Sequence, residues 1–262
     1  MGVLNVTSDS FSDGGRYRDF DAAVRRGREM VAEGADIVDV GGESTRPGAS
    51  TVPEDEEMRR VVPVIEALSG EVRISVDTTK AAVAHAALSA GATMLNDVSA
   101  ELAAVAAEHG AAYVAMHRKG TPADMQIDPR YDDVVAEVGE YLAGKARWAR
   151  AAGVSEIYVD PGIGFGKTVR HNLQLLAALP RLVAAGVPVL VGTSRKSFIG
   201  HLAAGGSPDG RVGDPTPLPA DRRLEGSLAS AVWAMACGAA VVRVHDVAPT
   251  ADAARLLRAV VA

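Results

Sequence analysis

Short β-prone apolar runs that end on a polar side chain recur along this chain, and they constrain its fold more than any other feature. The clearest is IYVDPGIGFGKT, Ile157–Thr168, in which three apolar residues precede Asp160 and a Pro-Gly turn. A buried run that stops on a charged residue is typical of a parallel strand that presents a side chain to a site. Similar runs lie at Val3–Asn5, Val38–Val40, Ile74–Asp77, Met94–Asp97, Val114–His117 and Val241–Asp246.

Helical patterns separate these runs along the whole chain. From Gly2–Val6 to Ala240–His245 we count eight strand–helix units in 262 residues, which is the size and rhythm of a (β/α)8 barrel. A doubly wound open sheet is the alternative, but it would gather polar residues at one crevice rather than at nearly every strand end. We therefore predict an α/β protein with a single TIM-barrel domain spanning residues 1–262.

The boundaries of the helices follow from periodicity and from glycines at helix ends. Five predicted helices stop at a glycine just before the next strand, where glycine supplies the left-handed end conformation. These glycines are Gly34, Gly91, Gly153, Gly186 and Gly238. The predicted helices include 20–33, 54–69, 101–109, 131–152, 171–185 and 251–261. Residues 204–221, rich in Gly, Pro and Asp, are predicted to form a flexible insertion in the seventh connection.

Composition excludes several classes of protein. The net charge is −6 and the basic residues are scattered, so we expect no nucleic-acid partner. No apolar stretch of about 18 residues is present, so we expect no membrane span. Cys237 is the single cysteine, which is consistent with a reducing compartment, and we predict a cytoplasmic protein.

Polar residues at the predicted strand ends are the candidate site. In a barrel the carboxyl ends of the strands face the active site. Any one of these residues could simply end a strand or cap a helix. Together they form a pocket of carboxylates, amides and cations that is costly to bury without a polar ligand. The set is Asn5, Asp77, Asn96, Asp160, Lys196, Arg243 and His245.

Two other motifs suggest chemistry that the sequence does not support. PGIGFGKT nearly matches a phosphate-binding loop, but Pro161 stands where the first glycine is required. His117 and His245 lack the neighbouring ligands of a structural zinc site. We predict neither a phosphate loop nor zinc.

Six motifs in order resemble the dihydropteroate synthase family over essentially the whole chain. They are GVLNVTSDSFSDGG at Gly2–Gly15, DVGGESTRPGA at Asp39–Ala49, NDVS at Asn96–Ser99, DPGIGFGKT at Asp160–Thr168, GTSRKSFIG at Gly192–Gly200 and RVHDV at Arg243–Val247. One departure is Ala100, where the family usually has glycine. The resemblance implies an enzyme that joins a dihydropterin diphosphate to p-aminobenzoate and releases pyrophosphate.

The resemblance also implies roles for single residues. Asp160 would accept hydrogen bonds from the donor edge of the pterin, which a carboxylate matches in two-pronged geometry. The other implied pterin contacts are Asp77, Asn96, Val98, Met116, Phe165, Gly192, Lys196 and Arg243. Asn5, Arg46, Arg243 and His245 would bind the diphosphate, with Mg²⁺ held through Asn5. Phe11, Thr45, Arg46, Pro47, Phe165, Lys196 and Ser197 would enclose p-aminobenzoate.

The implied reaction is a displacement at the pterin methylene carbon in which the diphosphate leaves first. Electrostatic stabilisation of the leaving group would then dominate catalysis, and the implied catalytic residues are Asp160, Lys196, Arg243 and His245. Two alternatives are a methyltetrahydrofolate methyltransferase-like domain and a non-catalytic pterin-binding protein. The methyltransferase has no diphosphate to bind, so Arg46 and the SRK and RVH motifs would be unexplained. An apolar helix face at Leu228–Met235 would suit a homodimer, and burial of that face in the core is the alternative explanation.

Overall fold

Within the part of the chain that the structure describes, eight parallel strands form the centre of the molecule. The structure is a computed structural model that describes residues 1–6, 16–44, 51–121, 123–210 and 213–261. Strands β1 to β6 make one sheet in chain order, and β7 and β8 make a second pair. Their bounds are β1 Gly2–Asn5, β2 Ile37–Gly41, β3 Arg73–Asp77, β4 Met94–Asp97, β5 Ala112–Met116, β6 Ile157–Asp160, β7 Leu190–Val191 and β8 Val241–Val242.

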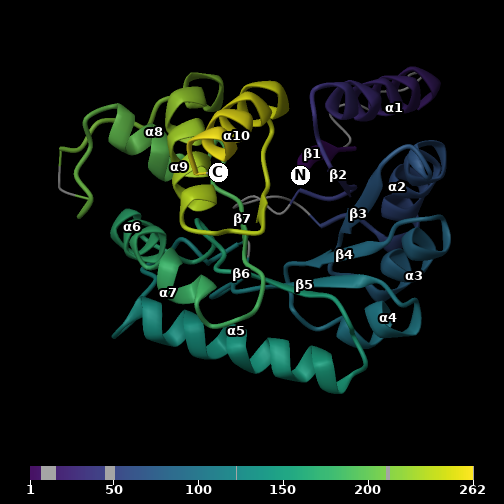
Figure 1. Cartoon of the computed structure of the whole chain (residues 1–262), viewed down its shortest axis with the longest axis horizontal. Helices are drawn as coiled ribbons and strands as arrows, with labels where there is room; N and C mark the ends of the chain where they lie inside the picture. The colour runs from purple at the N-terminus through teal and green to yellow at the C-terminus, as the bar shows by residue number, and fades with distance from the viewer. Residues whose placement is uncertain (7–15, 45–50, 122, 211–212, 262) are drawn as a thin grey trace.

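Two parallel bridges join the sheets into a closed ring. Val159 pairs with Val189 between β6 and the residue before β7, and Gly2 pairs with Val244 just beyond β8. The amide of Val3 donates to the carbonyl of Val244 at 2.9 Å, and the amide of Val159 donates to the carbonyl of Pro188 at 3.0 Å. The predicted TIM barrel is therefore confirmed, with helices around the ring of strands (Figure 1).

The helices agree with the predicted pattern except in three places. They are α1 Arg16–Ala32, α2 Glu54–Leu68, α3 Ala81–Ser89, α4 Ala103–Glu108, α5 Val134–Ala151, α6 Val169–Ala177, α7 Leu179–Val183, α8 Ser197–Ala203, α9 Leu224–Ala236 and α10 Val247–Val261. The helix predicted over 171–185 is wrong as one element. It divides into α6 and α7 at Ala178, because Pro180 in the first turn of α7 has no N–H to continue α6. Helices α1 and α10 begin at Arg16 and Val247, each four residues before the predicted start.

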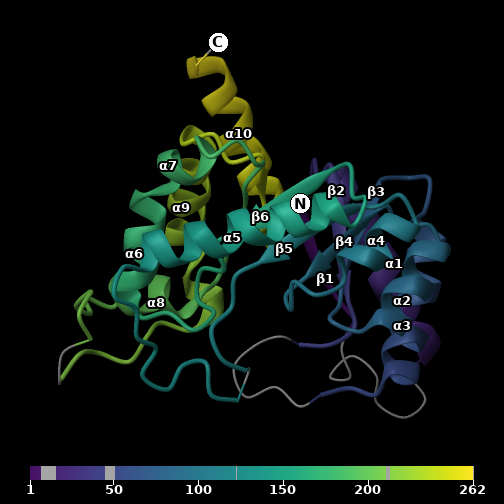
Figure 2. The same ribbon diagram turned by 90° about the horizontal axis from the view of Figure 1, so that it is seen from below.

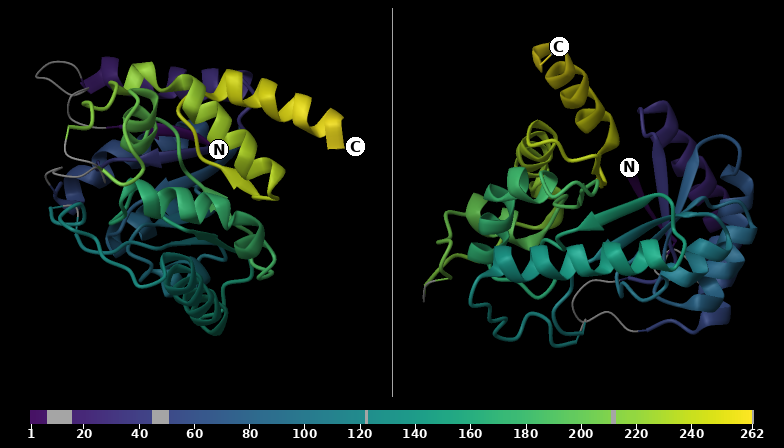
Figure 3. Two further views of the ribbon diagram at one scale, coloured as in Figure 1. Left: turned by 90° about the vertical axis from the view of Figure 1, so that its left-hand side faces the viewer. Right: turned by 60° about the horizontal axis from the view of Figure 1, so that its bottom comes forward.

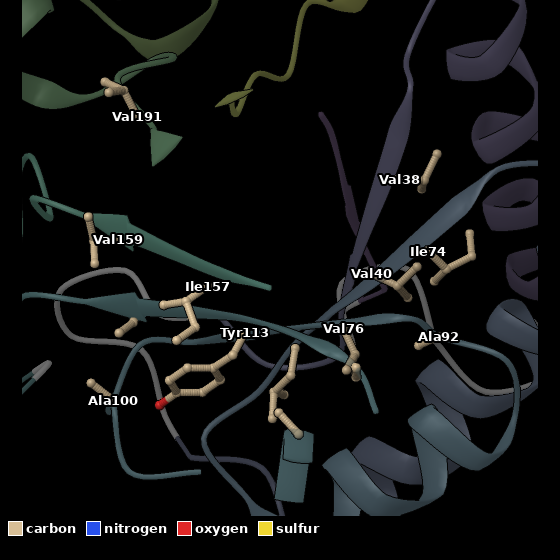
Figure 4. Close-up of a cluster of buried hydrophobic side chains, with 14 of the residues drawn as sticks. Val38, Val40, Ile74, Val76, Ala92, Ala100, Tyr113, Ile157, Val159 and Val191 are labelled. Carbon is tan, nitrogen blue, oxygen red and sulfur yellow. The ribbon is translucent and has the colours of Figure 1, made fainter. Parts of the chain in front are cut away.

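Side chains alternate between the two faces of each strand, as the period of two requires. Outward-facing residues such as Val38, Val40, Ile74 and Val76 pack with helix residues in the main core (Figure 4). Inside the barrel a separate apolar cluster contains Met1, Ile37, Met94, Ala112, Val114 and Leu190. These residues lie toward the amino ends of their strands, so the apolar plug leaves the carboxyl ends for polar side chains.

The connections after β5 and α8 lie on the side of the molecule opposite the projecting end of α10 (Figures 2 and 3). Within the predicted insertion, the short helix η2, Ala220–Arg222, is the regular element among the described residues. Arg170 on α6 forms an ion pair with Asp209, and His201 on α8 lies 3.4 Å from Asp214. Flexibility of this segment stays a prediction. Across the described ranges, no helix has the length and apolar character needed to cross a bilayer.

Ala100, which stands where the family usually has glycine, has a backbone conformation that favours glycine. Its φ is +56°, in the left-handed region that favours glycine, and its side chain is fully buried in the main core. Lys145 donates to its carbonyl at 2.7 Å. The turn between β4 and α4 therefore keeps the conformation that glycine adopts most readily.

Candidate active site

Arg243 joins three strands at the carboxyl end of the barrel. Its Nε donates to Oδ2 of Asp39 on β2 at 2.6 Å, and its Nη2 donates to Oδ2 of Asp77 on β3 at 2.7 Å. Asn96 on β4 donates to the same oxygen of Asp39 at 3.0 Å. Since Asp77 and Asn96 are also register partners, these four residues form one connected polar group.

The carboxylates of this group outnumber their cation. Burial raises the pKa of Asp77 to about 7, with Asp39 adding to the effect and Arg243 opposing it. Burial disfavours the charge on Arg243, but Asp39 and Asp77 outweigh it and raise its pKa. Among the described residues, Oδ1 of Asp39, Oδ1 of Asp77 and the hydroxyl of Ser75 have no hydrogen-bond partner. Buried acceptors of this kind suit a ligand that donates hydrogen bonds.

Asp160 ends β6 and is 5% exposed. Its Oδ1 accepts the N–H of Gly162 at 2.7 Å, while burial raises its pKa against the charge of Lys196. Gly162 has φ +65°, and a Cβ there would lie 1.8 Å from the carbonyl oxygen of His117. Only glycine allows the chain to turn this closely past the end of β5, and that turn directs Asp160 into the barrel.

Lys196 approaches the same pocket from the loop after β7. It donates to the carbonyl of Ile163, and its Nζ lies 4.7 Å from the centroid of the Phe165 ring. Burial lowers its pKa to about 8, although Asp160 opposes this. A Cβ on Gly192 would lie 3.8 Å from Cβ of Arg243 and 4.0 Å from Nζ of Lys196. Glycine at this position leaves the space between the two cations open.

Lys167 has a different place from that of a phosphate-loop lysine. It is 2% exposed, and its Nζ lies 2.9 Å from Nδ1 of His117 and 3.0 Å from the carbonyl of Phe165. Burial lowers the pKa of Lys167 to about 7, and burial together with Lys167 lowers the pKa of His117 to about 3. This pair holds the turn after β6 against the end of β5, as expected if PGIGFGKT is not a phosphate loop.

A second part of the site lies beside β1 and β8. Asn5 and His245 line a cavity of about 380 Å³, as do Arg195 and Asp246. Its other lining residues include Arg26 and Met30 of α1, Glu33, and Val247, Ala248 and Pro249 of α10, so it lies between these two helices. The backbone N–H of His245 donates to the hydroxyl of Ser194 at 3.1 Å, and its Nδ1 lies 3.0 Å from the same oxygen. Ser197 is exposed at the first position of α8. The loops after β7 and β8 are thus in direct contact.

Apart from Asn5, Gly192, Ser197 and His245, which are described above, the predicted residues divide into three groups. Asp77, Asn96, Asp160, Lys196 and Arg243 meet at the barrel end, and Met116 is the register partner of Asp160. Val98 and Met116 are buried, and Phe165 is half-buried. Phe11, Thr45, Arg46 and Pro47 lie outside the described residues, so their predicted roles stay predictions.

Sequence reasoning missed two buried residues of this site, Asp39 and Lys167. Asp39 is fully buried and accepts hydrogen bonds from both Arg243 and Asn96. The signal was available in VDV, Val38–Val40, because a charged residue inside a short β run must face either the core or the barrel interior. For Lys167 the sequence offers only its place in a glycine-rich turn, which does not indicate where the side chain points.

A closed barrel whose carboxyl end gathers carboxylates, an amide and two cations defines an enzyme site for a small polar molecule. The sequence profile of a family described as pterin binding enzyme matches residues 1–245.

Known proteins similar to this chain agree with that class. The dihydropteroate synthase of Mycobacterium leprae is 49% identical over 268 residues, which cover 99% of this chain and 92% of the relative. A structure of the Yersinia pestis dihydropteroate synthase with a sulfonamide drug complex has a TM-score of 0.88 and 42% identity, covering 99% of this chain and 93% of that one. The Xanthomonas albilineans enzyme in complex with 7,8-dihydropteroate has a TM-score of 0.84 and 43% identity, covering 100% and 93%. This chain belongs to the dihydropteroate synthases, a family of pterin-binding enzymes.

Proposed function

We propose that this enzyme condenses a 7,8-dihydropterin-6-ylmethyl diphosphate with p-aminobenzoate to give 7,8-dihydropteroate and pyrophosphate. The observation that carries the proposal is the convergence of Asp77, Asn96, Asp160, Lys196 and Arg243 on one end of the barrel. The product named in the Xanthomonas albilineans complex supports the same substrates.

Asp160 takes the donor edge of the pterin in this proposal. Its Oδ1 is already bonded to Gly162, so Oδ2 and the remaining lone pair of Oδ1 meet the ring's N–H groups. The unpartnered oxygen of Asp77 and the carbonyl of Asn96 supply further polar contacts on the ring. Lys196 donates to the ring carbonyl, Arg243 lies along the ring face, and Met116, Val98 and Phe165 form apolar walls.

The diphosphate lies toward β1 and β8 in this proposal, beside Asn5 and His245. The described residues contain no group of three or more His, Cys, Asp or Glu side chains that could hold a metal ion. A cation at Asn5 would take most of its oxygens from water and from the diphosphate, which is how proteins commonly bind Mg²⁺. Asn5 is exposed at the carboxyl end of β1, so its amide oxygen fits the role of that one protein ligand, and Mg²⁺ would neutralise the diphosphate charge when bound. Arg243 and His245 would add positive charge at the leaving oxygen.

The chemistry needs little proton transfer from the protein. The aniline nitrogen of p-aminobenzoate is a neutral nucleophile at pH 7, and the pterin ring delocalises the positive charge that develops at the methylene carbon. A C–O bond to the diphosphate breaks, a C–N bond forms, and the aniline proton leaves to solvent. Stabilising the departing diphosphate is then the main contribution of the site. Ser197 and Lys196 would hold the aminobenzoate carboxylate.

Two finer parts of the proposal concern assembly and location. Trp233 on α9 is 48% exposed within the Leu228–Met235 face, and we place a homodimer contact there. Sedimentation of wild type and a Trp233→Glu variant tests that contact. Cytoplasmic location rests on the single cysteine and stays a prediction.

One assay tests the proposed reaction. The protein is incubated with the dihydropterin diphosphate, Mg²⁺ and labelled p-aminobenzoate, and label in dihydropteroate is the expected result. Absence of product from protein that binds the pterin would favour the non-catalytic alternative. Methyl transfer from methyltetrahydrofolate, without dihydropteroate formation, would favour the methyltransferase alternative.

The metal proposal predicts the effect of Asn5→Ala. We expect Mg²⁺-dependent affinity for pyrophosphate to fall about tenfold, because one amide ligand is lost, while affinity for a 6-substituted pterin changes less than about twofold. Calorimetry with each ligand measures both. With EDTA present, variant and wild type should bind pyrophosphate equally, and equal losses for both ligands in Mg²⁺ would contradict the assignment.

The half-buried position of Lys196 beside Asp160 predicts a pH dependence. Its pKa of about 8 means that the ammonium is lost as pH rises through 8. Pterin affinity should therefore fall about tenfold for each pH unit above that value. Calorimetry from pH 7 to 9.5 measures this, with Lys196→Arg as the control, because its guanidinium stays charged over the whole range. An identical decline in the arginine variant would assign the titration to another group.

A further inference from the structure

One ion pair links the loops after β7 and β8. Arg195 donates from Nε to Oδ2 of Asp246 at 3.0 Å and from Nη2 to Oδ1 at 2.5 Å. This two-pronged geometry fixes both side chains more firmly than a single contact does. Hydrogen bonding to Arg195 lowers the pKa of Asp246, although burial opposes this, so the pair is charged at neutral pH.

The backbone of Arg195 is held in an unfavourable conformation. Its φ is +58°, which a residue with a side chain rarely adopts. The N–H of Arg195 donates to Ser227 at 2.9 Å, and its carbonyl accepts Nη1 of Arg223 at 2.7 Å. Strain persists where surrounding contacts maintain it, and here those contacts set the direction of the next residues, Lys196 and Ser197.

The other partner is adjacent in sequence to His245. Asp246 immediately follows it, and the hydroxyl of Ser194, immediately before Arg195, contacts both N and Nδ1 of His245. The two loops therefore meet twice. The ion pair lies one residue from Lys196 and from His245, and the Ser194 contact is made by His245 itself.

We propose that the Arg195–Asp246 ion pair is a positioning device that holds Lys196 and Ser197 in register with His245 for the transfer reaction. In the proposed function Lys196 and Ser197 bind the pterin and the aminobenzoate, and His245 binds the diphosphate. The Arg195–Asp246 ion pair therefore aligns the nucleophile with the leaving group. This inference rests on the proposed function. Neither Arg195 nor Asp246 needs to touch substrate for it.

The chain offers a matched control at the other end of the barrel. Arg73, at the start of β3, makes an equivalent two-pronged pair with Glu156, just before β6, at 2.9 and 2.8 Å. Asp246→Asn and Glu156→Gln each remove one charge from such a pair and keep the shape of the side chain. A general loss of stability would affect both variants.

The first readout is turnover per pterin-binding site, with sites counted by calorimetry. A folding defect lowers the number of sites, whereas misalignment lowers the turnover of each. We expect Asp246→Asn to lose about tenfold to hundredfold per site and Glu156→Gln to stay within about twofold. Equal turnover of the two variants would overturn the inference. That result would not affect the proposed function. An inactive wild-type enzyme would overturn the proposed function.

A second pair of variants separates the ion pair from the backbone strain. Arg195→Gly removes the side chain, and glycine adopts φ +58° without strain. If the pair positions the loops, this variant should match Asp246→Asn, and the double variant should be no worse than either. Wild-type turnover in Arg195→Gly, or additive losses in the double variant, would contradict the proposal.

A third readout needs no turnover. Backbone amides in 193–197 and 244–247 should exchange with solvent faster in Asp246→Asn than in wild type. In Glu156→Gln their exchange rates should equal those of wild type. Unchanged exchange in Asp246→Asn would overturn the positioning role even if the enzyme proved inactive on these substrates.

Discussion

Asp160→Asn is expected to abolish measurable pterin binding while the protein stays folded. Oδ1 of Asp160 already accepts a hydrogen bond from the N–H of Gly162. An asparagine would therefore keep its carbonyl oxygen at that position and turn its NH2 group toward the ligand. A donor would then face the donor edge of the pterin, and the charge that strengthened both hydrogen bonds would be gone. We expect a loss of about 3 kcal/mol or more, which is at least about a hundredfold in affinity. Calorimetry with a 6-substituted pterin measures it.

The melting temperature and the pterin affinity should change in different ways in the Asp160→Asn variant. Burial raises the pKa of Asp160 in the folded protein, so its ionised form disfavours folding once the pH exceeds the ordinary carboxyl value. A neutral asparagine removes that cost, and the melting temperature at pH 7 should hold or rise. Near-native pterin affinity in the variant would mean that Asp160 only ends a strand and that the pterin lies elsewhere.

Asp97 provides the matched control. It is fully buried at the end of β4 but faces outward, where it accepts the N–H groups of Glu101 and Leu102 and the hydroxyl of Tyr113. Asp97→Asn should lower the melting temperature, because those donors lose a charged acceptor, and leave pterin affinity of the folded protein intact. The two variants thus have opposite expected effects on stability and binding.

Strand ends and periodicity were enough to predict the barrel, because each β run is short, apolar and followed by a helix. They were also enough to place Asp77, Asn96, Asp160 and Arg243 at one end, since carboxyl ends of parallel strands meet. Periodicity alone did not place the break before Pro180, which follows from proline's missing N–H, or the early starts of α1 and α10.

The interior of the barrel was harder to predict. Asp39 lies two residues before the end of its strand, so a rule based on strand ends overlooks it. Its importance depends on Arg243, which is 204 positions away in sequence and reaches it only because the barrel closes. Lys167 likewise acquires its partner, His117, only when β5 and β6 pair.

Asp39→Leu is expected to lose about 3–5 kcal/mol of stability, because it leaves Nε of Arg243 and Nδ2 of Asn96 without their shared acceptor inside the barrel. Asp39→Asn should lose less, since its carbonyl can still accept both hydrogen bonds and its NH2 would occupy the place of the unpartnered Oδ1. Ser75→Ala is the control, because Ser75 is the register partner of Asp39, is fully buried and has a hydroxyl without a partner among the described residues. Denaturant unfolding should rank the losses as Leu, then Asn, then the near-neutral alanine control. If Asp39→Leu is as stable as Ser75→Ala, Asp77 alone holds Arg243 and the carboxylate of Asp39 is dispensable.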